Sequence, residues 1–527
     1  MSMRVRTGAL AAAALLVAGA VVGCSGGADK DTGKNADEKA GSPSASGKAT
    51  PGGGDPALPA ALTGQKLDWK GCEAPTEAYG SYARKPGSQW QCATMRVPLD
   101  YARPSGETIG IALVRSEAGE PDRRIGSLLF NFGGPGGSGV AALPTADSFG
   151  TLHSRYDLVS FDPRGVAQSV AVVCRGDKET EKSLRLDSTP DTAAEEKAYL
   201  DDAAAFGAGC AKKSGRVLAH VGTVDAARDM DLMRAVLGDD KLHYLGISYG
   251  TELGGVYAHL FPKNVGRLVL DAVVDPSADF VGHSRNQAVG FQRALENYFK
   301  SRGISAQDGT ARVVKLLDRL DRGPLPAQQG RTLTQSLALT GIISTLYSQE
   351  SWDYLTEALK EAEGGDGTKL LATAESFNNR DEEGHYATQD HSQRAISCAD
   401  AKGRVSAAEV RSRHLADFTE ASPVFGPYLA WDLAGWCAQW PVPGEWETPE
   451  VSAQGAAPVL VIGTTGDPAT PFEGARKMAD ELGAGVGVLI SNKGEGHGAY
   501  GTSSCVTKTV DAYLLDGKVP ANGKTCS

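Results

Sequence analysis

The chain has 527 residues, and its 53 Lys and Arg residues against 64 Asp and Glu residues leave a net charge of −11. A net acidic chain argues against a general nucleic-acid binder, because phosphate contacts require clustered positive charge. The hydrophobic content of 41 % and the charged content of 22 % are typical of a globular protein of one to three domains and exclude a wholly disordered chain.

Residues 1–23 have the layout of an export signal. Arg4 and Arg6 precede an apolar stretch at 9–22, which is shorter than the ~20 residues of a membrane-spanning helix. The stretch ends in Val-Val-Gly-Cys24, which resembles a bacterial lipobox, where the cysteine becomes the lipidated first residue of the mature protein. We therefore expect a lipoprotein signal peptide at 1–23 and a lipid anchor at Cys24; the alternative is a plain signal peptide with an incidental cysteine.

Residues 24–60 are mostly Gly, Ala, Ser, Lys, Asp and Pro and contain no aromatic residue. Such a segment buries too little apolar surface to offset its ordering entropy, so we expect a flexible tether. Together with the signal, it predicts an exported surface lipoprotein on the outer face of the cell membrane. The lipid at Cys24 either holds it there or the protein is shed into the medium.

Beyond the tether, short apolar runs alternate with helical patterns. Near-continuous apolar runs of this length are typical of central strands in a parallel sheet, and their alternation with helices predicts an α/β domain. Upstream, we expect 90–99 and 108–114 to be antiparallel strands that begin the sheet. The predicted central strands lie at 127–132, 156–162, 242–247, 267–274, 458–463 and 486–491.

The clearest helical pattern lies between two of these strands. Apolar residues such as Ala226 and Met230 fall on one face at helical spacing. Thr223 is the predicted N-cap of this helix, and Gly238 is its predicted stop.

The strand pattern lapses at 276–450, where helical patterns dominate, and resumes at 451. We therefore expect a sheet core formed by 61–275 and 451–527, with a helical cap inserted at 276–450. An insertion that leaves and re-enters a sheet can cover the C-terminal ends of the strands, where α/β active sites lie. The alternative is a structural side domain.

A nucleophile is predicted at Ser248. The sequence Gly246-Ile-Ser-Tyr-Gly250 is a G-x-S-x-G motif between a predicted strand and a helix, which is the context of a nucleophile elbow. The tight turn requires a strained serine backbone, and the flanking glycines avoid a steric clash there. The motif alone is common, but between strand and helix it indicates a reactive serine.

The serine requires a base and an acid, which follow it along the chain in this motif's usual order. His497 lies just past the last predicted strand and is the predicted base. Asp467 follows the strand at 458–463 in Thr-Thr-Gly-Asp-Pro and is the predicted acid, positioned to orient the imidazole. The rival acids are Asp271, Asp275 and Glu495.

The Gly-rich segment at 131–139, Asn-Phe-Gly-Gly-Pro-Gly-Gly-Ser-Gly, follows another predicted strand. Glycines there let backbone amides approach a developing oxyanion, and the predicted donors are the amides of Gly134 and Tyr249. A phosphate loop is the competing interpretation, but no G-K-[ST] follows and the glycine spacing does not fit. With neither H-E-x-x-H nor paired C-x-x-C motifs in the sequence, we expect no metal site and no cofactor.

Four segments together carry a family resemblance. They are similar to the prolyl-aminopeptidase branch of α/β-hydrolases, and above all to the secreted tripeptidyl aminopeptidases and mycelium-associated proteinases of streptomycetes. The similarity runs from about residue 67 to the C-terminus and includes Ala-Ile-Ser-Cys-Ala-Asp at 395–400. A departure is Phe132, where relatives commonly have Pro or His. The segments are Asn131 to Gly139, Asp162-Pro-Arg164-Gly165, Gly246 to Gly250 and Gly466-Asp467-Pro468.

The resemblance implies an α/β-hydrolase fold and a secreted serine exopeptidase. Such an enzyme removes short peptides, often tripeptides, from peptides or proteins with free N-termini. One alternative is a carboxylesterase or lipase with the same triad, because the motif itself does not distinguish an ester from an amide. Another is a surface binding lipoprotein without turnover, although a binder has no need of all three triad residues.

Nine cysteines remain to be assigned. With Cys24 lipidated, eight are left for an oxidising compartment, where disulfides persist. Eight cysteines allow 105 pairings. Sequence neighbours suggest the pairs Cys72–Cys92, Cys174–Cys210, Cys398–Cys437 and Cys505–Cys526.

Overall fold

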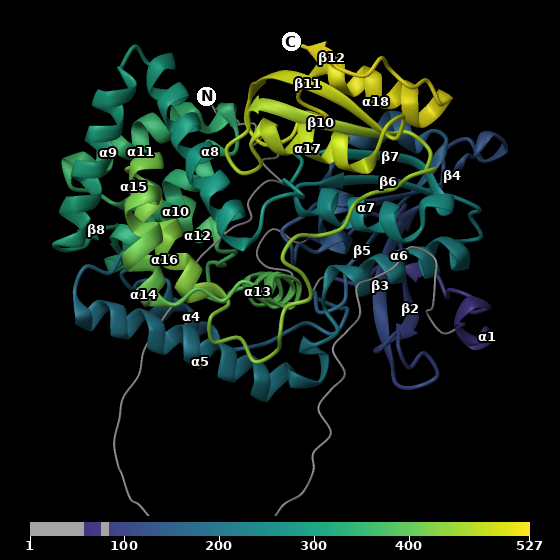
Figure 1. The fold of residues 1–527 in the computed structure, drawn as a ribbon, viewed down its shortest axis with the longest axis horizontal. Helices are drawn as coiled ribbons and strands as arrows, with labels where there is room; N and C mark the ends of the chain where they lie inside the picture. Colours follow the sequence, from purple (N-terminus) through teal and green to yellow (C-terminus); the bar gives the residue numbers. More distant parts are fainter. Residues whose placement is uncertain (1–56, 75–83) are drawn as a thin grey trace, which may run out of the picture.

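The structure is a computed structural model that describes residues 57–74 and 84–527. Its centre is a ten-stranded sheet of order β1-β2-β3-β5-β4-β6-β7-β10-β11-β12 (Figure 1). The strands are β1 Lys70–Gly71, β2 Gln91–Pro98, β3 Thr108–Ser116, β4 Gly126–Asn131, β5 Tyr156–Phe161, β6 Leu242–Ile247, β7 Val265–Asp271, β10 Val459–Gly466, β11 Gly487–Glu495 and β12 Lys524–Cys526.

The sheet is parallel from β5 through β12, and its first strands β1, β2 and β3 pair antiparallel. All residues of β4 and β5 are buried, which explains their nearly continuous apolar sequences. The predicted α/β class, the mostly parallel sheet and the antiparallel opening strands are therefore confirmed.

Two groups of helices pack against the sheet. Helices α6, α7 and α17 lie side by side, and α3 contacts α18. Helix α6 buries Ala226 and Met230 and ends at Gly238 in the left-handed conformation, as predicted. The bounds are α1 Ala60–Thr63, α2 Gly139–Ala142, α3 Gly150–His153, α6 Thr223–Leu237, α7 Tyr249–Leu260, α17 Phe472–Leu482 and α18 Ser504–Asp516.

The predicted N-cap of α6 is wrong. The capping position is Gly222, whose backbone is extended, and Thr223 is already the first helical residue. A carboxylate from another helix, that of Asp400, accepts the amide of Thr223 instead (N···O 2.8 Å). A side chain that is distant in the sequence thus accepts a helix N-terminal amide that a local capping residue usually accepts.

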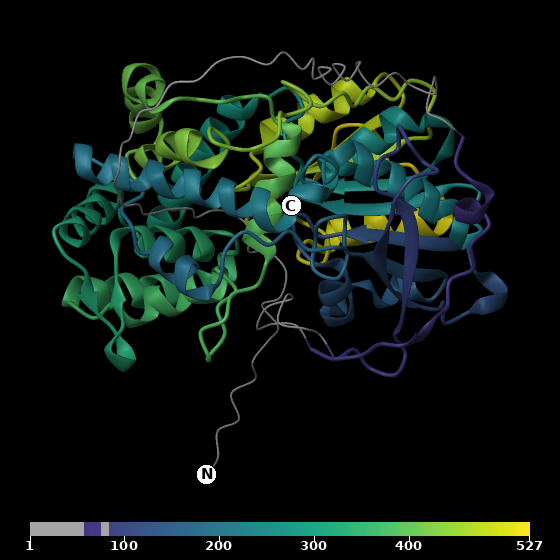
Figure 2. The same ribbon diagram turned by 90° about the horizontal axis from the view of Figure 1, so that it is seen from below.

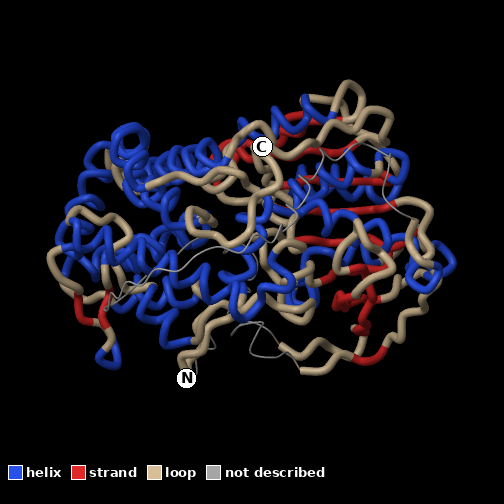
Figure 3. Tube along the Cα trace, turned by 60° about the horizontal axis from the view of Figure 1, so that its bottom comes forward, coloured by secondary structure: helices blue, strands red, loops and turns tan. Residues whose placement is uncertain are grey.

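The remaining helices form a second lobe beside the sheet (Figures 2 and 3). It has its own hydrophobic cluster, which includes Phe291, Leu339 and Trp431. A short hairpin of β8 Leu325–Pro326 and β9 Thr332–Leu333 lies within its chain. The helices are α8 Phe280–Ser301, α9 Ala306–Asp321, α10 Gln335–Leu346, α11 Trp352–Gly364, α12 Thr368–Phe377, α14 Ala407–Glu409, α15 Leu415–Ala421 and α16 Gly426–Trp436. Helix α13 (Gln389–Asp400) lies between α12 and α14 in the chain, but its buried Ala395, Ile396 and Cys398 belong to the cluster of the sheet.

Helices α4 (Asp177–Ser183) and α5 (Ala193–Leu218) run along the lower side of this lobe (Figure 1). Tyr199 of α5 belongs to the cluster of the helical lobe, whereas Phe206 of the same helix belongs to the cluster of the sheet. The stretch that precedes β6 in sequence therefore joins the two cores.

Four disulfides brace the described part of the chain, and they are the pairs that sequence neighbours suggested: Cys72–Cys92, Cys174–Cys210, Cys398–Cys437 and Cys505–Cys526. No helix in the described part of the chain combines the length and apolar character needed to cross a bilayer. The predicted signal peptide, Cys24 and most of the predicted tether lie outside the described residues.

Candidate active site

Ser248 stands in the turn between β6 and α7. Its backbone has φ 58° and ψ −125°, a conformation that a non-glycine residue adopts only under strain. A Cβ at Gly250 would lie 2.6 Å from the carbonyl oxygen of Asn131, so this flanking position tolerates no side chain. The amide of Ser248 donates to the carbonyl of Asp271 (N···O 3.1 Å), which ties the turn to the neighbouring strand. The strand–elbow–helix geometry predicted from the motif is present.

His497 and Asp467 meet at the carboxyl ends of β11 and β10. Nδ1 of His497 lies 2.9 Å from Oδ1 and 3.0 Å from Oδ2 of Asp467. The side chains are 4 % and 0 % exposed. With Nδ1 engaged by the carboxylate, the neutral ring carries its proton there and leaves Nε2 as the free acceptor. The pair therefore forms the orienting half of a base–acid arrangement.

The loop around each residue fixes this pair. Asp467 Oδ1 also accepts the amides of Ala469 (3.0 Å) and Thr470 (2.9 Å). The amide of His497 donates to the carbonyl of Tyr347 in the helical lobe (2.8 Å), and the Tyr347 ring packs edge-on against the imidazole at 5.3 Å. Tyr347 and Thr470 belong to no recognisable motif, so neither could be predicted as a site residue from the sequence.

Two opposing effects act on the pKa of His497. Burial alone lowers it, because the dry site disfavours the imidazolium. The charge and hydrogen bond of Asp467, together with the charge of Asp271, outweigh burial and raise the pKa above its ordinary value of 6.5. The site is thus suited to a histidine that takes up a proton during reaction.

The rival acids are engaged elsewhere. Asp271 accepts the amides of Ala499 (2.9 Å) and Tyr500 (2.7 Å) and so braces the loop that carries His497. The carboxylate of Asp275 accepts from Lys477 (2.7 Å), Ser277 and Asn286, and Glu495 accepts from Asn297 (3.0 Å). Of the four carboxylates considered, Asp467 is the one hydrogen-bonded to the His497 ring.

The Gly-rich loop lies directly against the elbow. A Cβ at Gly133 would stand 2.8 Å from Cβ of Ser248 and 2.6 Å from the carbonyl oxygen of Ile247. The amide of Gly133 is already used by the side chain of Asn131 (2.9 Å). The amide of Gly134 has no acceptor among the described residues.

The second predicted donor is the amide of Tyr249. It opens α7 and therefore has no partner within the helix. The Gly-rich loop that faces it is anchored by Asp162, whose Oδ1 accepts the hydroxyl of Ser138 (2.6 Å) and the amide of Val140 (3.2 Å). The ring of Phe132 stacks on Phe130 at 6.1 Å, so its side chain serves packing.

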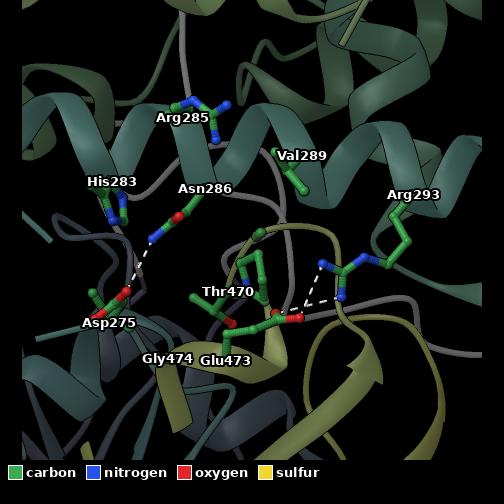
Figure 4. Close-up of a pocket in the computed structure, with 12 residues that line it drawn as sticks. Asp275, His283, Arg285, Asn286, Val289, Arg293, Thr470, Glu473 and Gly474 are labelled. Carbon is green, nitrogen blue, oxygen red and sulfur yellow. Dashed lines mark hydrogen bonds and ion pairs between the residues drawn. The ribbon is translucent and has the colours of Figure 1, made fainter. Parts of the chain in front are cut away.

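A pocket of about 250 Å³ lies between α8 and the segment that enters α17 (Figure 4). Asn286 reaches across it to Asp275 (3.1 Å), and Arg293 pairs with Glu473 (3.3 Å). Thr470 lines it, but none of Ser248, Asp467 and His497 does. The pocket therefore lies beside the segment that follows Asp467, and the predicted triad does not line it.

Among residues 57–74 and 84–527, no cluster of three or more His, Cys, Asp and Glu side chains is arranged to hold a metal ion. A strained serine, a buried His–Asp pair and two amides without acceptors together provide the parts of acyl transfer.

Comparison with known proteins gives relatives that align over more than four fifths of both chains. A family model described as TAP-like protein matches residues 422–526. Serine protease Hip1 of Mycobacterium tuberculosis is 37 % identical over 492 residues, covering 88 % of this chain and 91 % of that protein. Tripeptidyl aminopeptidase of Streptomyces lividans is 32 % identical over 484 residues, covering 88 % and 86 %. Carboxylesterase B of Mycobacterium tuberculosis is 34 % identical over 459 residues, covering 83 % and 86 %.

Proposed function

The chain belongs to the TAP-like family of α/β-hydrolases and is a serine peptidase of that family, and on this premise we propose that it releases short peptides, chiefly tripeptides, from free N-termini. The similarity to a tripeptidyl aminopeptidase supports this specificity. The substrates are peptides or proteins with an unblocked amino end.

In the proposed reaction, Oγ of Ser248 attacks the scissile carbonyl while Nε2 of His497 takes up the hydroxyl proton. Asp467 holds the imidazole by Nδ1 and stabilises the cation that forms. The amides of Gly134 and Tyr249 donate to the oxyanion. His497 then gives the proton to the leaving amine, the C–N bond breaks, and water releases the peptide from the acyl-enzyme by the same steps.

The observation that best supports this function is the buried pairing of His497 with Asp467. A buried charge pair is costly to maintain for stability alone. Here it stands at the carboxyl ends of neighbouring strands, at the same edge of the sheet as an elbow serine under backbone strain. A surface binding protein has no use for that combination, so turnover is the better explanation.

Export and anchoring are proposed with the activity. The four disulfides fit a protein that folds in an oxidising compartment. The lipobox-like sequence that ends at Cys24 supports a lipid anchor on the outer face of the membrane. The acidic net charge gives no support for a nucleic-acid partner.

The test is a panel of peptide amides with one to four residues before the scissile bond, each with a free and an acetylated N-terminus. We expect turnover of the free tripeptide to exceed that of its acetylated form and of the other lengths. Equal turnover of free and acetylated peptides would refute the aminopeptidase claim. Ser248→Ala is the matched control and should abolish turnover of every member.

A second candidate function, ester hydrolysis, has support from the 34 % identical relative named carboxylesterase B. The same triad cleaves esters readily, because their leaving group needs less assistance from the general acid. Comparing kcat/KM for a tripeptide amide with kcat/KM for a short acyl ester distinguishes the peptidase from the esterase. A high kcat/KM for the ester, with no cleavage of the amide, would favour the esterase.

A further inference from the structure

Helix α13 (Gln389–Asp400) contacts the Gly-rich loop with its first turns. A Cβ on Gly136 would lie 2.7 Å from the carbonyl oxygen of Gln389 and 2.7 Å from the amide nitrogen of Gln393. The loop backbone therefore rests directly on the helix, with no side chain between them. This loop carries Gly134, one of the two proposed oxyanion donors.

The last residue of the same helix connects to the other donor. Asp400 Oδ1 accepts the amide of Thr223 (2.8 Å), and Oδ2 accepts its hydroxyl (2.7 Å). The hydroxyl oxygen of Thr223 lies 2.6 Å from the phenol oxygen of Tyr249. Since the Thr223 hydroxyl donates to Asp400, the phenol of Tyr249 donates to Thr223.

The three side chains that form these hydrogen bonds are buried from solvent. Thr223 is 0 %, Asp400 4 % and Tyr249 5 % exposed. In such surroundings hydrogen bonds are strong, and a partner left without its bond is costly. Burial also raises the pKa of the Tyr249 phenol well above its ordinary value, so the phenol keeps the proton that it donates.

Helix α13 is itself held in place. Cys398 forms a disulfide with Cys437, just past the end of α16. The hydroxyl of Ser392 donates to the carbonyl of Gly165 (2.7 Å), and the guanidinium of Arg394 donates to the carbonyl of Trp436 (2.6 Å). A helix fixed at these points is a rigid base for whatever rests on it.

We infer that α13 sets the geometry of the oxyanion hole, with Asp400, Thr223 and the phenol of Tyr249 as positioning residues. The first turns of the helix support the loop of Gly134, and its last residue fixes the side chain whose own amide is the second donor. This role accounts for the Ala-Ile-Ser-Cys-Ala-Asp segment at 395–400, which the triad leaves unexplained. The inference rests on the proposed acyl-transfer function of Ser248.

The test removes the hydrogen bonds without removing the amide. Tyr249→Phe and Thr223→Val each break the bond between the two side chains, and Thr223→Ser keeps a hydroxyl and serves as the rescue. Tyr257→Phe is the matched control, because Tyr257 lies on the same helix α7, is fully buried and donates to Asp231 (3.0 Å) instead. The concentration of active sites is measured by titration with a phosphonate, so that unfolded protein does not lower the apparent kcat.

We expect kcat on a free tripeptide amide to fall about tenfold in Tyr249→Phe and in Thr223→Val, with KM within about twofold. The loss is smaller than the 10²–10³-fold cost of deleting an oxyanion donor, because the amide is misaligned and not removed. Thr223→Ser and Tyr257→Phe should retain the wild-type kcat. Affinity for a peptide aldehyde, which forms a tetrahedral adduct on the serine, should fall with kcat, whereas affinity for the product tripeptide should not.

The double variant Tyr249→Phe with Thr223→Val should have a kcat no lower than that of Thr223→Val, because both substitutions break the bond between these two side chains and Thr223→Val alone already removes the bond to Asp400. A kcat for Tyr249→Phe equal to that of Tyr257→Phe overturns the inference, as does an equal loss of aldehyde and product affinity. If Thr223→Val does not fold, Tyr249→Phe alone decides. Turnover that survives in Ser248→Ala would instead refute the proposed function, which separates the two failures.

Discussion

Replacing Asp467 by Asn removes the charge from the His497 partner and keeps the shape of the side chain. In the structure, the amides of Ala469 and Thr470 both donate to Oδ1. They hold the oxygen of the new amide group at that position, so its NH₂ group takes the place of Oδ2, 3.0 Å from Nδ1 of His497. Oδ1 also lies 2.9 Å from Nδ1, but it already accepts two amides, whereas the NH₂ group donates. The favoured arrangement is therefore the one in which Nδ1 accepts from the NH₂ group.

The ring consequently carries its proton on Nε2 and presents a donor to Ser248 where a base is required. A change of this kind in a serine triad lowers kcat about 10⁴-fold. At 1.36 kcal/mol per factor of ten, this corresponds to about 5 kcal/mol of lost transition-state stabilisation.

The pH profile should shift as well. In the wild type, Asp467 raises the pKa of His497 above 6.5 despite burial. His497 must be unprotonated to act as base, so the wild-type activity falls as the pH drops through this raised pKa. In Asp467→Asn, only the charge of Asp271 still opposes burial, and the acidic limb of the remaining activity should move to a lower pH than in the wild type.

The assay is kcat and kcat/KM on a free tripeptide amide from pH 5 to 9, with phosphonate titration of active sites. Asp275→Asn is the matched control, since it makes the same change at a rival carboxylate that pairs with Lys477. A kcat within tenfold of wild type for Asp467→Asn, or an acidic limb that does not move, would refute the role given to Asp467.

Three further outcomes follow from the same contacts. Gly133→Ala should lower kcat about 10²-fold, since its Cβ would stand 2.8 Å from Cβ of Ser248 and displace the reacting atoms; steady-state kinetics within twofold of wild type would contradict this. Asp271→Asn should lower the free energy of unfolding by about 1–3 kcal/mol, because the amides of Ala499 and Tyr500 lose a charged acceptor; an unchanged urea midpoint would count against it. Reduction should add eight hydrogens to the mature protein, two for each of the four disulfides, and a smaller gain in intact mass would mean that a pair is unformed.

The elements around Ser248 were predictable because their signals are local. Strands β4, β5 and β6 are short apolar runs, and five consecutive residues form the motif that predicts the elbow. The positions of Asp467 and His497 followed from the loop order typical of the motif, and the resemblance to tripeptidyl aminopeptidases is confirmed by a relative at 32 % identity. Local pattern and loop order therefore suffice to predict that Ser248, Asp467 and His497 lie at one edge of the sheet.

The contacts that hold the site together were not predictable in the same way. Asp400 accepts the first amide of α6 although it lies 177 residues from Thr223 in the sequence, whereas the local pattern wrongly predicted Thr223 as the N-cap. The support of His497 by Tyr347 also comes from the helical lobe, which has no counterpart in the motif. Such contacts depend on how the two lobes pack, and periodicity along one segment carries no information about its distant partners.

The most direct test of the central claim is to locate the covalent adduct of a fluorophosphonate on the mature protein by peptide mass spectrometry. The account predicts one adduct, on Ser248, that forms with loss of peptidase activity and forms far more slowly in His497→Ala. Full inactivation with the adduct on another residue, or peptidase activity that persists when Ser248 is fully modified, would contradict it.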